Sequence, residues 1–330
     1  MLSDCARIIG FVALLLVPLP IANAAQAQTP AAEPTDLPAQ TTPSEAVGDK
    51  LNRYFDFVLP EKSPLWDPDW RRASWPEVAA FAGIGLAGVV GSAVIPARRE
   101  PLWRGGILWD DAIQNRLMVT GSAADVAPIA SDIGLYVLLA APLVDAAATA
   151  GWARNDRRTA FELAVMDLEA QALTSTVVWA LKAAIGRERP LDFHRGCFDP
   201  ALAGPSDPAC AKAKNTSFPS NHAASSFTSA VLMCTQHAHI ALYGNVQDQL
   251  VCVEALVLAT GVSIARVMGD THYTSDIVVG AAIGALSGWA VPNLLHFRAG
   301  GQQKSTAKFE FALMPLAAPS GVSLTLFGVL

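Results

Sequence analysis

Charged side chains are scarce in this 330-residue chain: they make up 16% of it, whereas 52% of the residues are apolar. Positive charge is not in excess either, because 23 Lys and Arg residues stand against 29 Asp and Glu residues, for a net charge of −6. A nucleic-acid partner requires a basic stripe that neutralises phosphates, and here the basic residues are scattered. The composition therefore argues against nucleic-acid binding and favours a deeply buried or membrane-embedded core.

The first 24 residues have the layout of a secretory signal peptide. Arg7 precedes an apolar run over residues 8–20, and the small residues 22–24 follow it. This pattern predicts cleavage after about Ala24. The alternative is a retained membrane anchor, but the apolar run is shorter than the ~20 residues that a bilayer span requires. Either interpretation predicts export to the periplasm or cell envelope.

Cysteine is rare, and four cysteines remain after the predicted cleavage: Cys197, Cys210, Cys234 and Cys252. An even number in an exported protein permits disulfide bonds. Cys197 and Cys210 lie in one loop that contains Pro and Gly, which predicts that they pair with each other. The alternative is four free buried thiols, because the other two cysteines lie in apolar helical segments.

Strand-like alternation is nearly absent from the middle of the chain. Six long apolar segments predict helices instead, at residues 77–96, 126–150, 161–185, 222–242, 250–265 and 276–296. The fold class is therefore all-α, a six-helix bundle. Residues 308–330 differ, since two alternating stretches around a Pro-Ser-Gly turn predict a short β-hairpin. A lone hairpin is barely stable, so it must pack on the bundle or on an outer-membrane partner.

Five regions follow from these patterns: a signal peptide (1–24), a disordered linker (25–50), a collar rich in aromatic residues and Pro (51–76), the helical domain (77–300) and the hairpin (308–330). Charged residues in the third predicted helix, Glu162, Asp167 and Glu169, would be costly in lipid. The sequence therefore favours an exported domain with membrane association, and an integral membrane protein is the alternative.

Three short clusters lie at predicted helix ends, at residues 182–190 (KAAIGRERP), 219–222 (PSNH) and 266–276 (RVMGDTHYTSD). The first closes the third predicted helix, the second opens the fourth, and the third links the fifth to the sixth. In an up-and-down bundle such ends meet on one face. The clusters contain fixed positive charge, which binds phosphate, and two histidines, which transfer protons and phosphoryl groups near neutral pH.

The order and spacing of these clusters resemble the type 2 phosphatidic acid phosphatase (PAP2) superfamily, which also contains the bacterial acid phosphatases and the vanadium haloperoxidases. The family pattern is K-x6-RP, then PSGH, then SR-x5-H-x3-D. The matching residues, over a resemblance that covers roughly residues 160–292, are Lys182, Arg189, Pro190, Ser220, His222, Arg266, His272 and Asp276.

Two positions depart from the family pattern. Asn221 replaces the usual Gly, and Ala265 replaces the usual Ser. Asn tolerates a left-handed backbone better than other non-Gly residues, so Asn221 can still present its N–H to a phosphate. Ala265 lacks a hydroxyl donor, and we expect that loss to be modest beside three retained cations.

The resemblance implies a two-step hydrolysis. His272 attacks phosphorus while Asp276 orients it, and His222 protonates the leaving oxygen and then activates water. Lys182, Arg189, Ser220, Asn221 and Arg266 would bind the phosphate, and the set requires no metal or other cofactor. Asp276 and Ser220 also have a purely structural interpretation as helix caps.

The predicted function is a metal-independent phosphatase, acting outside the cytoplasm on a phosphorylated small molecule or on a lipid or isoprenoid phosphate. A vanadate-dependent haloperoxidase and a non-catalytic envelope protein are the alternatives. His237 and His239 lie two residues apart, hence on different helix faces, and are assigned to packing. His194 follows the first cluster and is a weak candidate for substrate contact, and no role is assigned to His296. The oligomeric state is not predicted.

Overall fold

The computed structural model describes residues 65–94, 100–199, 201, 208–244 and 246–298, and also the backbone of 310–318 and 321–329. The predicted signal peptide (1–24), the linker (25–50) and the collar up to residue 64 lie outside the described residues. Their boundaries stay predictions.

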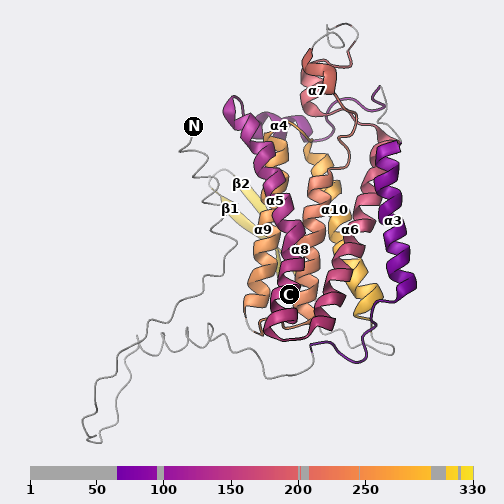
Figure 1. Ribbon diagram of the computed structural model, residues 1–330. Coiled ribbons are helices and arrows are strands. Elements are labelled where there is room, and N and C mark those ends of the chain that lie inside the picture. The colour runs from indigo at the N-terminus through magenta and orange to yellow at the C-terminus, as the bar shows by residue number, and fades with distance from the viewer. Residues whose placement is uncertain are drawn as a thin grey trace, which may run out of the picture.

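Long helices lie side by side as a bundle (Figure 1): α3 (Trp75–Val94), α5 (Ser122–Ala146), α6 (Arg157–Ile185), α8 (Asn221–His239), α9 (Gln247–Met268) and α10 (Thr274–Val291). The π-helical turns η1 (Ala147–Ala153) and η4 (Pro292–His296) extend α5 and α10, and the 3-10 turn η3 (Pro208–Lys212) lies in a loop. The all-helical class of the bundle is confirmed. The predicted number of six helices is not, because the described residues contain eight α-helices.

The two additional helices are α4 (Asp110–Leu117) and α7 (Pro190–His194), which cover the same end of the bundle (Figure 1). Only three of the eight residues of α4 are apolar, so it has no periodic apolar face to indicate a helix. α7 has five residues and begins at Pro190, where proline favours a helix start.

Glycines set the closest helix contact. A Cβ added at Gly280, Gly284 or Gly288 of α10 would lie 2.4, 2.0 or 2.5 Å from a backbone carbonyl oxygen of α8 or of its N-cap residue. Small residues four apart allow two backbones to approach in this way. The spacing also shows that α8 and α10 run in the same direction, so their first turns lie together.

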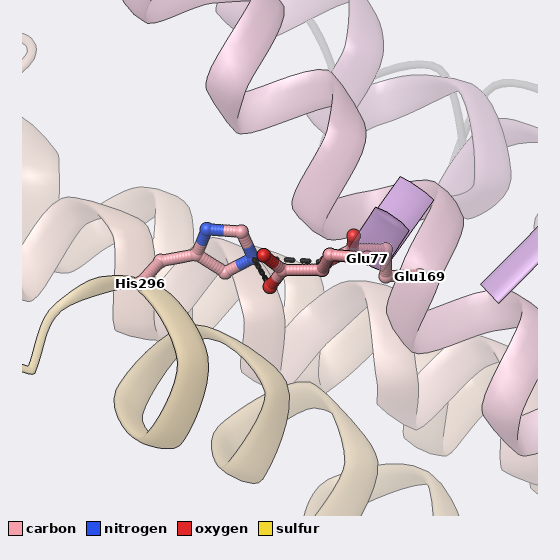
Figure 2. Close-up of side chains that lie close together, drawn as sticks. All are labelled: Glu77, Glu169 and His296. Atoms are coloured by element: carbon pink, nitrogen blue, oxygen red, sulfur yellow. Dashed lines mark hydrogen bonds and ion pairs between the residues drawn. The ribbon is translucent and has the colours of Figure 1, made fainter. Parts of the chain in front are cut away.

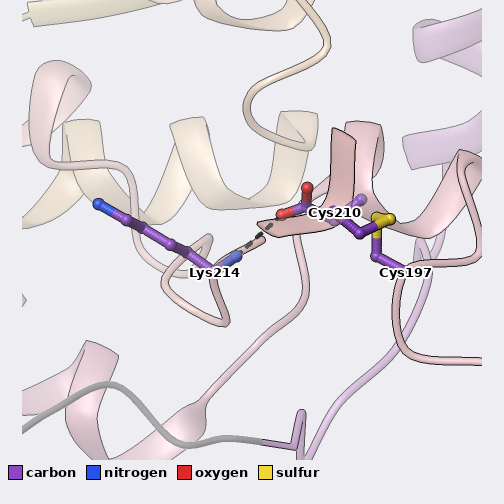
Figure 3. The surroundings of a disulfide bond; sticks show 4 residues. Cys197, Cys210 and Lys214 are labelled. Atoms are coloured by element: carbon purple, nitrogen blue, oxygen red, sulfur yellow. Dashed lines mark hydrogen bonds between the residues drawn. A yellow bond between two sulfur atoms is a disulfide. The ribbon is translucent and has the colours of Figure 1, made fainter. Parts of the chain in front are cut away.

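Disulfides join two pairs of cysteines. Cys197 and Cys210 are bonded within the loop that follows α7 (Figure 3), which confirms the predicted pair. Cys234 and Cys252 are also bonded and connect α8 to α9. The alternative of four free thiols is therefore wrong.

Four helical segments are long and apolar enough to cross a membrane: Trp75–Val94, Ser122–Ala153, Gln247–Met268 and Thr274–His296. Large apolar side chains remain exposed on them, among them Val89 (67%), Val257 (52%) and Leu286 (64%). Exposed apolar surface on this scale is typical of contact with lipid. These features are consistent with the integral membrane alternative and with the membrane association that the sequence predicted.

The charges that argued against membrane spans point into the protein. Glu162, Asp167 and Glu169 of α6 are exposed by only 4%, 2% and 2%. Charged residues inside a membrane bundle face its interior in this way. The sequence argument counted these residues correctly but did not establish which side of the helix they occupy.

Two strands follow the bundle. β1 (Glu310–Ala318) pairs antiparallel with β2 (Gly321–Val329), with Glu310 opposite Val329 and Ala318 opposite Gly321. The packing of this hairpin on the bundle or on a partner stays a prediction.

Candidate active site

Backbone hydrogen bonds bring the three sequence clusters together at the end of the bundle that α4 and α7 cover. The N–H of Ser217, just before the second cluster, donates to the carbonyl of Arg187 in the first (3.0 Å). Leu191, after the first cluster, donates to Asp270 in the third (3.0 Å). Ser220 donates to the carbonyl of Asp276 (3.0 Å), which joins the second cluster to the third. Each link is between main-chain atoms, so the arrangement does not depend on side-chain rotamers.

The three cations predicted to bind phosphate lie close together. Lys182 Nζ donates to the backbone carbonyls of Thr216 and Ser217. Arg189 lies within electrostatic range of Lys182 and Arg266. The Nε atoms of Arg189 and Arg266 are buried and have no hydrogen-bond partner among the described residues. Buried guanidinium donors without partners are costly, and an anion would satisfy them.

His272 lies in the turn between α9 and α10 and is only 2% exposed. Its Nδ1 atom is 3.5 Å from Oδ2 of Asp276, which is within ion-pair range but long for a hydrogen bond. Catalytic contacts are often this loose before substrate binds. Burial lowers the pKa of His272 to about 3, and the positive charges of Lys182 and Arg189 act in the same direction. The imidazole is therefore neutral, the form that a nucleophile requires.

Asp276, the third residue of α10, is completely buried and held from several sides. Its Oδ2 atom accepts hydrogen bonds from the Ser217 hydroxyl (2.5 Å) and from the N–H of Tyr273 (2.9 Å). Its Oδ1 atom accepts one from Arg187 (2.6 Å). The bond from Tyr273 caps the helix, so Asp276 caps α10 and also faces His272.

Arg187, which lies inside the first cluster, holds the carboxylate of Asp276 in place. Its guanidinium is fully buried and also pairs with Asp110 of α4 (2.8 Å). The rings of Trp103 and Tyr273 each lie 4.0 Å from its Cζ atom. Two carboxylates and two aromatic faces thus leave Arg187 little freedom to move, which in turn fixes Asp276.

His222, in the first turn of α8, contacts a carboxylate that the sequence analysis did not single out. Its Nε2 atom lies 2.7 Å from Oδ1 of Asp132 in α5. The same oxygen accepts from Arg266 (3.2 Å). Asp132 thus holds His222 beside one of the phosphate-binding cations, and its half-exposed side chain (51%) is accessible to solvent.

The remaining predicted site residues lie at the start of α8. Ser220 is the N-cap, and its hydroxyl accepts from the N–H of Ala223 (3.4 Å). Asn221 is the first residue of the helix and has no positive φ, so its tolerance of a left-handed backbone is not used. Ala265 is half-buried one residue before Arg266.

Three histidines outside the predicted site have carboxylate partners. His194 pairs with Asp270 (3.0 Å) at the same end of the bundle as the site. His237 lies between Asp145 (3.0 Å) and Asp248 (2.7 Å), so its role is an ionic network rather than simple packing. His296, to which no role was assigned, contacts Glu169 (2.8 Å).

The sequence analysis missed Arg187, Ser217, Asp110 and Asp132. The first two lie in or beside the recognised clusters, and only their contacts with Asp276 reveal their role. Asp110 and Asp132 come from distant helices, and no local pattern marks them. Their contacts with Arg187 and His222 become visible only when the bundle is assembled.

Comparison with known families agrees with this geometry. The sequence model of the PAP2 superfamily matches residues 165–299, which include all three clusters. Over these residues the chain is similar to the PAP2 superfamily. No curated protein and no solved structure matches the chain. Asp110 and Asp132, which contact Arg187 and His222, lie before the matched region.

Proposed function

We propose that this protein is a membrane-embedded, metal-independent phosphatase that hydrolyses lipid phosphate monoesters through a phosphohistidine intermediate. One observation carries the proposal. Two neighbouring buried arginines, Arg189 and Arg266, have unpartnered Nε donors, and Arg189 lies within electrostatic range of a buried neutral histidine that a carboxylate faces. This combination supplies a phosphate cradle and a nucleophile in the same place.

The first step transfers the phosphoryl group. The free ring nitrogen of His272 attacks phosphorus, and the bond from phosphorus to the alcohol oxygen breaks. His222 gives a proton to that oxygen, so the product leaves as a neutral alcohol. Asp276 stabilises the charge that develops on His272, while Lys182 and the two arginines neutralise the phosphoryl oxygens.

The second step releases phosphate. Water attacks phosphorus, His222 accepts a proton from that water, and the bond from phosphorus to His272 breaks. Asp132, which contacts Nε2 of His222, orients the ring for both proton transfers. The cations already supply the positive charge, so we expect the reaction to proceed in the presence of EDTA.

A lipid substrate fits the position of the site. The clusters lie at the ends of helices whose outward faces expose large apolar side chains, so the phosphate would be held at the membrane surface. A lipid or isoprenoid chain could then remain in the bilayer beside the bundle while its phosphate enters the cradle. If the protein selects its substrate by the apolar tail, it needs no charged side chains beyond those that bind the phosphate.

We place the site on the outer side of the membrane, as the resemblance to the PAP2 superfamily implies. The Cys197–Cys210 disulfide at the site end is compatible with this placement, because disulfides persist outside the cytoplasm. The start of α3 would then be cytoplasmic.

This orientation conflicts with a signal peptide at residues 1–24. Either a cleaved signal peptide or a retained membrane anchor would place the start of α3 on the outer side of the membrane. A single crossing by α3 would then place the site on the cytoplasmic side. Labelling of a Lys214→Cys variant with a membrane-impermeant maleimide in intact cells tests the orientation, because Lys214 is exposed in the loop at the site end. Labelling without permeabilisation supports an external site, and labelling only after permeabilisation contradicts it.

Activity is tested on the full chain purified in detergent. We expect release of phosphate from phosphatidic acid and from p-nitrophenyl phosphate in EDTA, with inhibition by low concentrations of vanadate, which imitates the five-coordinate transition state. The His272→Ala variant should release none. Absence of turnover on every phosphate monoester tested would contradict the proposal, and oxidation of bromide by peroxide with added vanadate would identify a haloperoxidase instead. Fractionation of the expressing cells with and without detergent tests the membrane location.

A further inference from the structure

A second cluster of ionisable side chains lies in the half of the bundle remote from the phosphate site. Glu77 comes from the first turn of α3, Glu169 from the middle of α6 and His296 from the end of η4. Figure 2 shows the His296 ring directed toward the two carboxylates. One ligand atom from each residue lies within 4.8 Å of the others, and the side chains are 7%, 3% and 0% exposed.

The internal contacts of this cluster leave polar atoms unsatisfied. His296 Nε2 contacts Oε2 of Glu169 (2.8 Å) and lies 3.9 Å from Oε1 of Glu77. Among the described residues, Oε1 of Glu77 and Oε1 of Glu169 are buried without a hydrogen-bond partner, as is Nδ1 of His296. The cluster thus contains two buried carboxylate oxygens and one buried imidazole nitrogen without hydrogen-bond partners, which is costly.

The other oxygen of Glu77 is fully engaged. Its Oε2 atom accepts from the N–H and the hydroxyl of Ser74 (both 3.3 Å), in the manner of a helix capping box. It also accepts from Arg71 (2.9 Å), whose side chain is 55% exposed and therefore neutralises little charge inside the cluster. The cap fixes the carboxylate so that its free oxygen points at His296.

We propose that Glu77, Glu169 and His296 form a binding site for a divalent transition metal, with Zn²⁺ as the best fit. Ligand atoms around tetrahedral zinc lie about 3.3 Å apart, and the separations here, from 2.8 to 3.9 Å for the pairs that include His296, bracket that value. The carboxylates of Glu77 and Glu169 would together carry two negative charges, which a divalent ion would balance. The imidazole favours a transition metal over Mg²⁺ or Ca²⁺, which prefer oxygen ligands only.

The ion would fasten α3 to the bundle. Within the described residues, α3 packs mainly on α6, through glycines that contact α6 side chains such as Ala172, Thr176 and Trp179. A metal bound by all three residues would join the first turn of α3 both to α6 and to the last turn after α10. The site is therefore structural, and it lies outside the phosphate-binding machinery.

The test uses the full-length protein, without a histidine tag, stripped with a chelator and then titrated with Zn²⁺. We expect one zinc per chain by elemental analysis and calorimetry, a raised melting temperature on zinc addition, and no displacement by a hundredfold excess of Mg²⁺. Each of Glu77→Gln, Glu169→Gln and His296→Asn should weaken binding by at least about tenfold, as loss of a ligand does. Glu100→Gln, an exposed glutamate in the loop after α3, is the matched control and should bind as the wild type does.

The outcomes separate the metal site from a plain ion cluster. No zinc uptake by the stripped wild type, with a melting temperature indifferent to zinc, overturns the proposal, and this result does not require that any variant folds. Unchanged affinity in all three folded variants overturns it as well, because the metal would then be bound elsewhere. Phosphate release is not the readout, so failure of the proposed phosphatase activity leaves this test intact.

Discussion

Two of the regions that contain buried ionisable groups differ in the groups that they bring together: the site end, and the cluster of Glu77, Glu169 and His296. At the site end, three cations (Lys182, Arg189 and Arg266) lie close together, and two arginine Nε atoms have no partner among the described residues. In the other region, the carboxylates of Glu77 and Glu169 converge on one histidine. Both regions bring together groups from several helices and leave buried polar atoms unsatisfied. In the two proposals, one region of the bundle binds an anion and another binds a cation.

Rigidity also differs between the two regions. Main-chain hydrogen bonds connect the three clusters of the phosphate site, and Arg187 locks Asp276 through two carboxylates and two rings. The Glu77 cluster is held by a helix cap, an ion pair of Glu77 with Arg71, one main-chain hydrogen bond from Arg71 to His296 and one contact of His296 with Glu169. Catalysis requires preorganised groups, whereas a structural metal can draw its ligands into place as it binds.

The largest expected effect separates the two regions directly. His272→Ala should lower kcat for p-nitrophenyl phosphate by at least about a thousandfold, because it removes the nucleophile. Glu169→Gln should keep kcat within about twofold, since Glu169 belongs to the other cluster. Steady-state assays of both variants, at equal amounts of folded protein, make the comparison. A large loss in Glu169→Gln would show that the two regions are coupled.

Replacement of the buried arginine tests the rigidity of the site end. Arg187→Lys keeps the charge but loses the fork that reaches Asp110 and Asp276 together. We expect kcat to fall by about 10- to 100-fold with little change in KM, because Asp276 would no longer be fixed behind His272. The kcat to KM split distinguishes positioning from weakened substrate binding. A wild-type kcat in a folded Arg187→Lys protein would mean that the guanidinium of Arg187 is not needed to hold Asp276 in position.

A smaller effect is expected at Asp132. Asp132→Asn should lower kcat by about tenfold, because the amide keeps the size of the side chain but orients His222 less firmly. Asp125→Asn, at an exposed position on the same helix, is the matched control and should retain full activity. Equal activities of the two variants would exclude Asp132 from the proton-transfer step.

The smallest expected effect concerns the pKa of His272 in the protein without substrate. Because burial lowers the pKa of His272 to about 3, its imidazole should remain neutral at pH 5, where an unperturbed histidine with a pKa near 6.5 is mostly protonated. The neutral form is lost only as the pH falls toward the lowered pKa. Titration by ¹⁵N nuclear magnetic resonance of histidine-labelled protein measures this value, and the His272→Ala spectrum assigns the signal. A midpoint near 6.5 would contradict the buried, cationic setting of the ring.

The sequence could predict that the proposed phosphate-site residues lie close together because they lie within three short stretches at helix ends. Lys182, Arg266 and His272 each belong to such a stretch, and an up-and-down bundle places these ends together. The six long helices were predictable for a similar reason, since each is a continuous apolar segment. Short α4 was not, because it is polar and is held by contacts such as that of Asp110 with Arg187.

The Glu77, Glu169 and His296 cluster had no sequence signal at all. Its residues come one from each of three elements, and each has an ordinary alternative in its own surroundings, such as the helix cap at Glu77. The sequence also did not show on which side of the helix each charged residue lies. The sequence shows Glu162 and Asp167 as charged residues of one helix, and only the structure shows that both are buried inside the bundle.

Trapping of the covalent intermediate tests the central claim most directly. Wild-type protein mixed with ³²P-labelled substrate and quenched within milliseconds should carry an alkali-stable, acid-labile phosphate, and mass spectrometry should place it on His272. The His272→Ala protein should carry none. Turnover by the wild type without any labelled protein, or with the label on another residue, would contradict the assignment of His272 as the nucleophile.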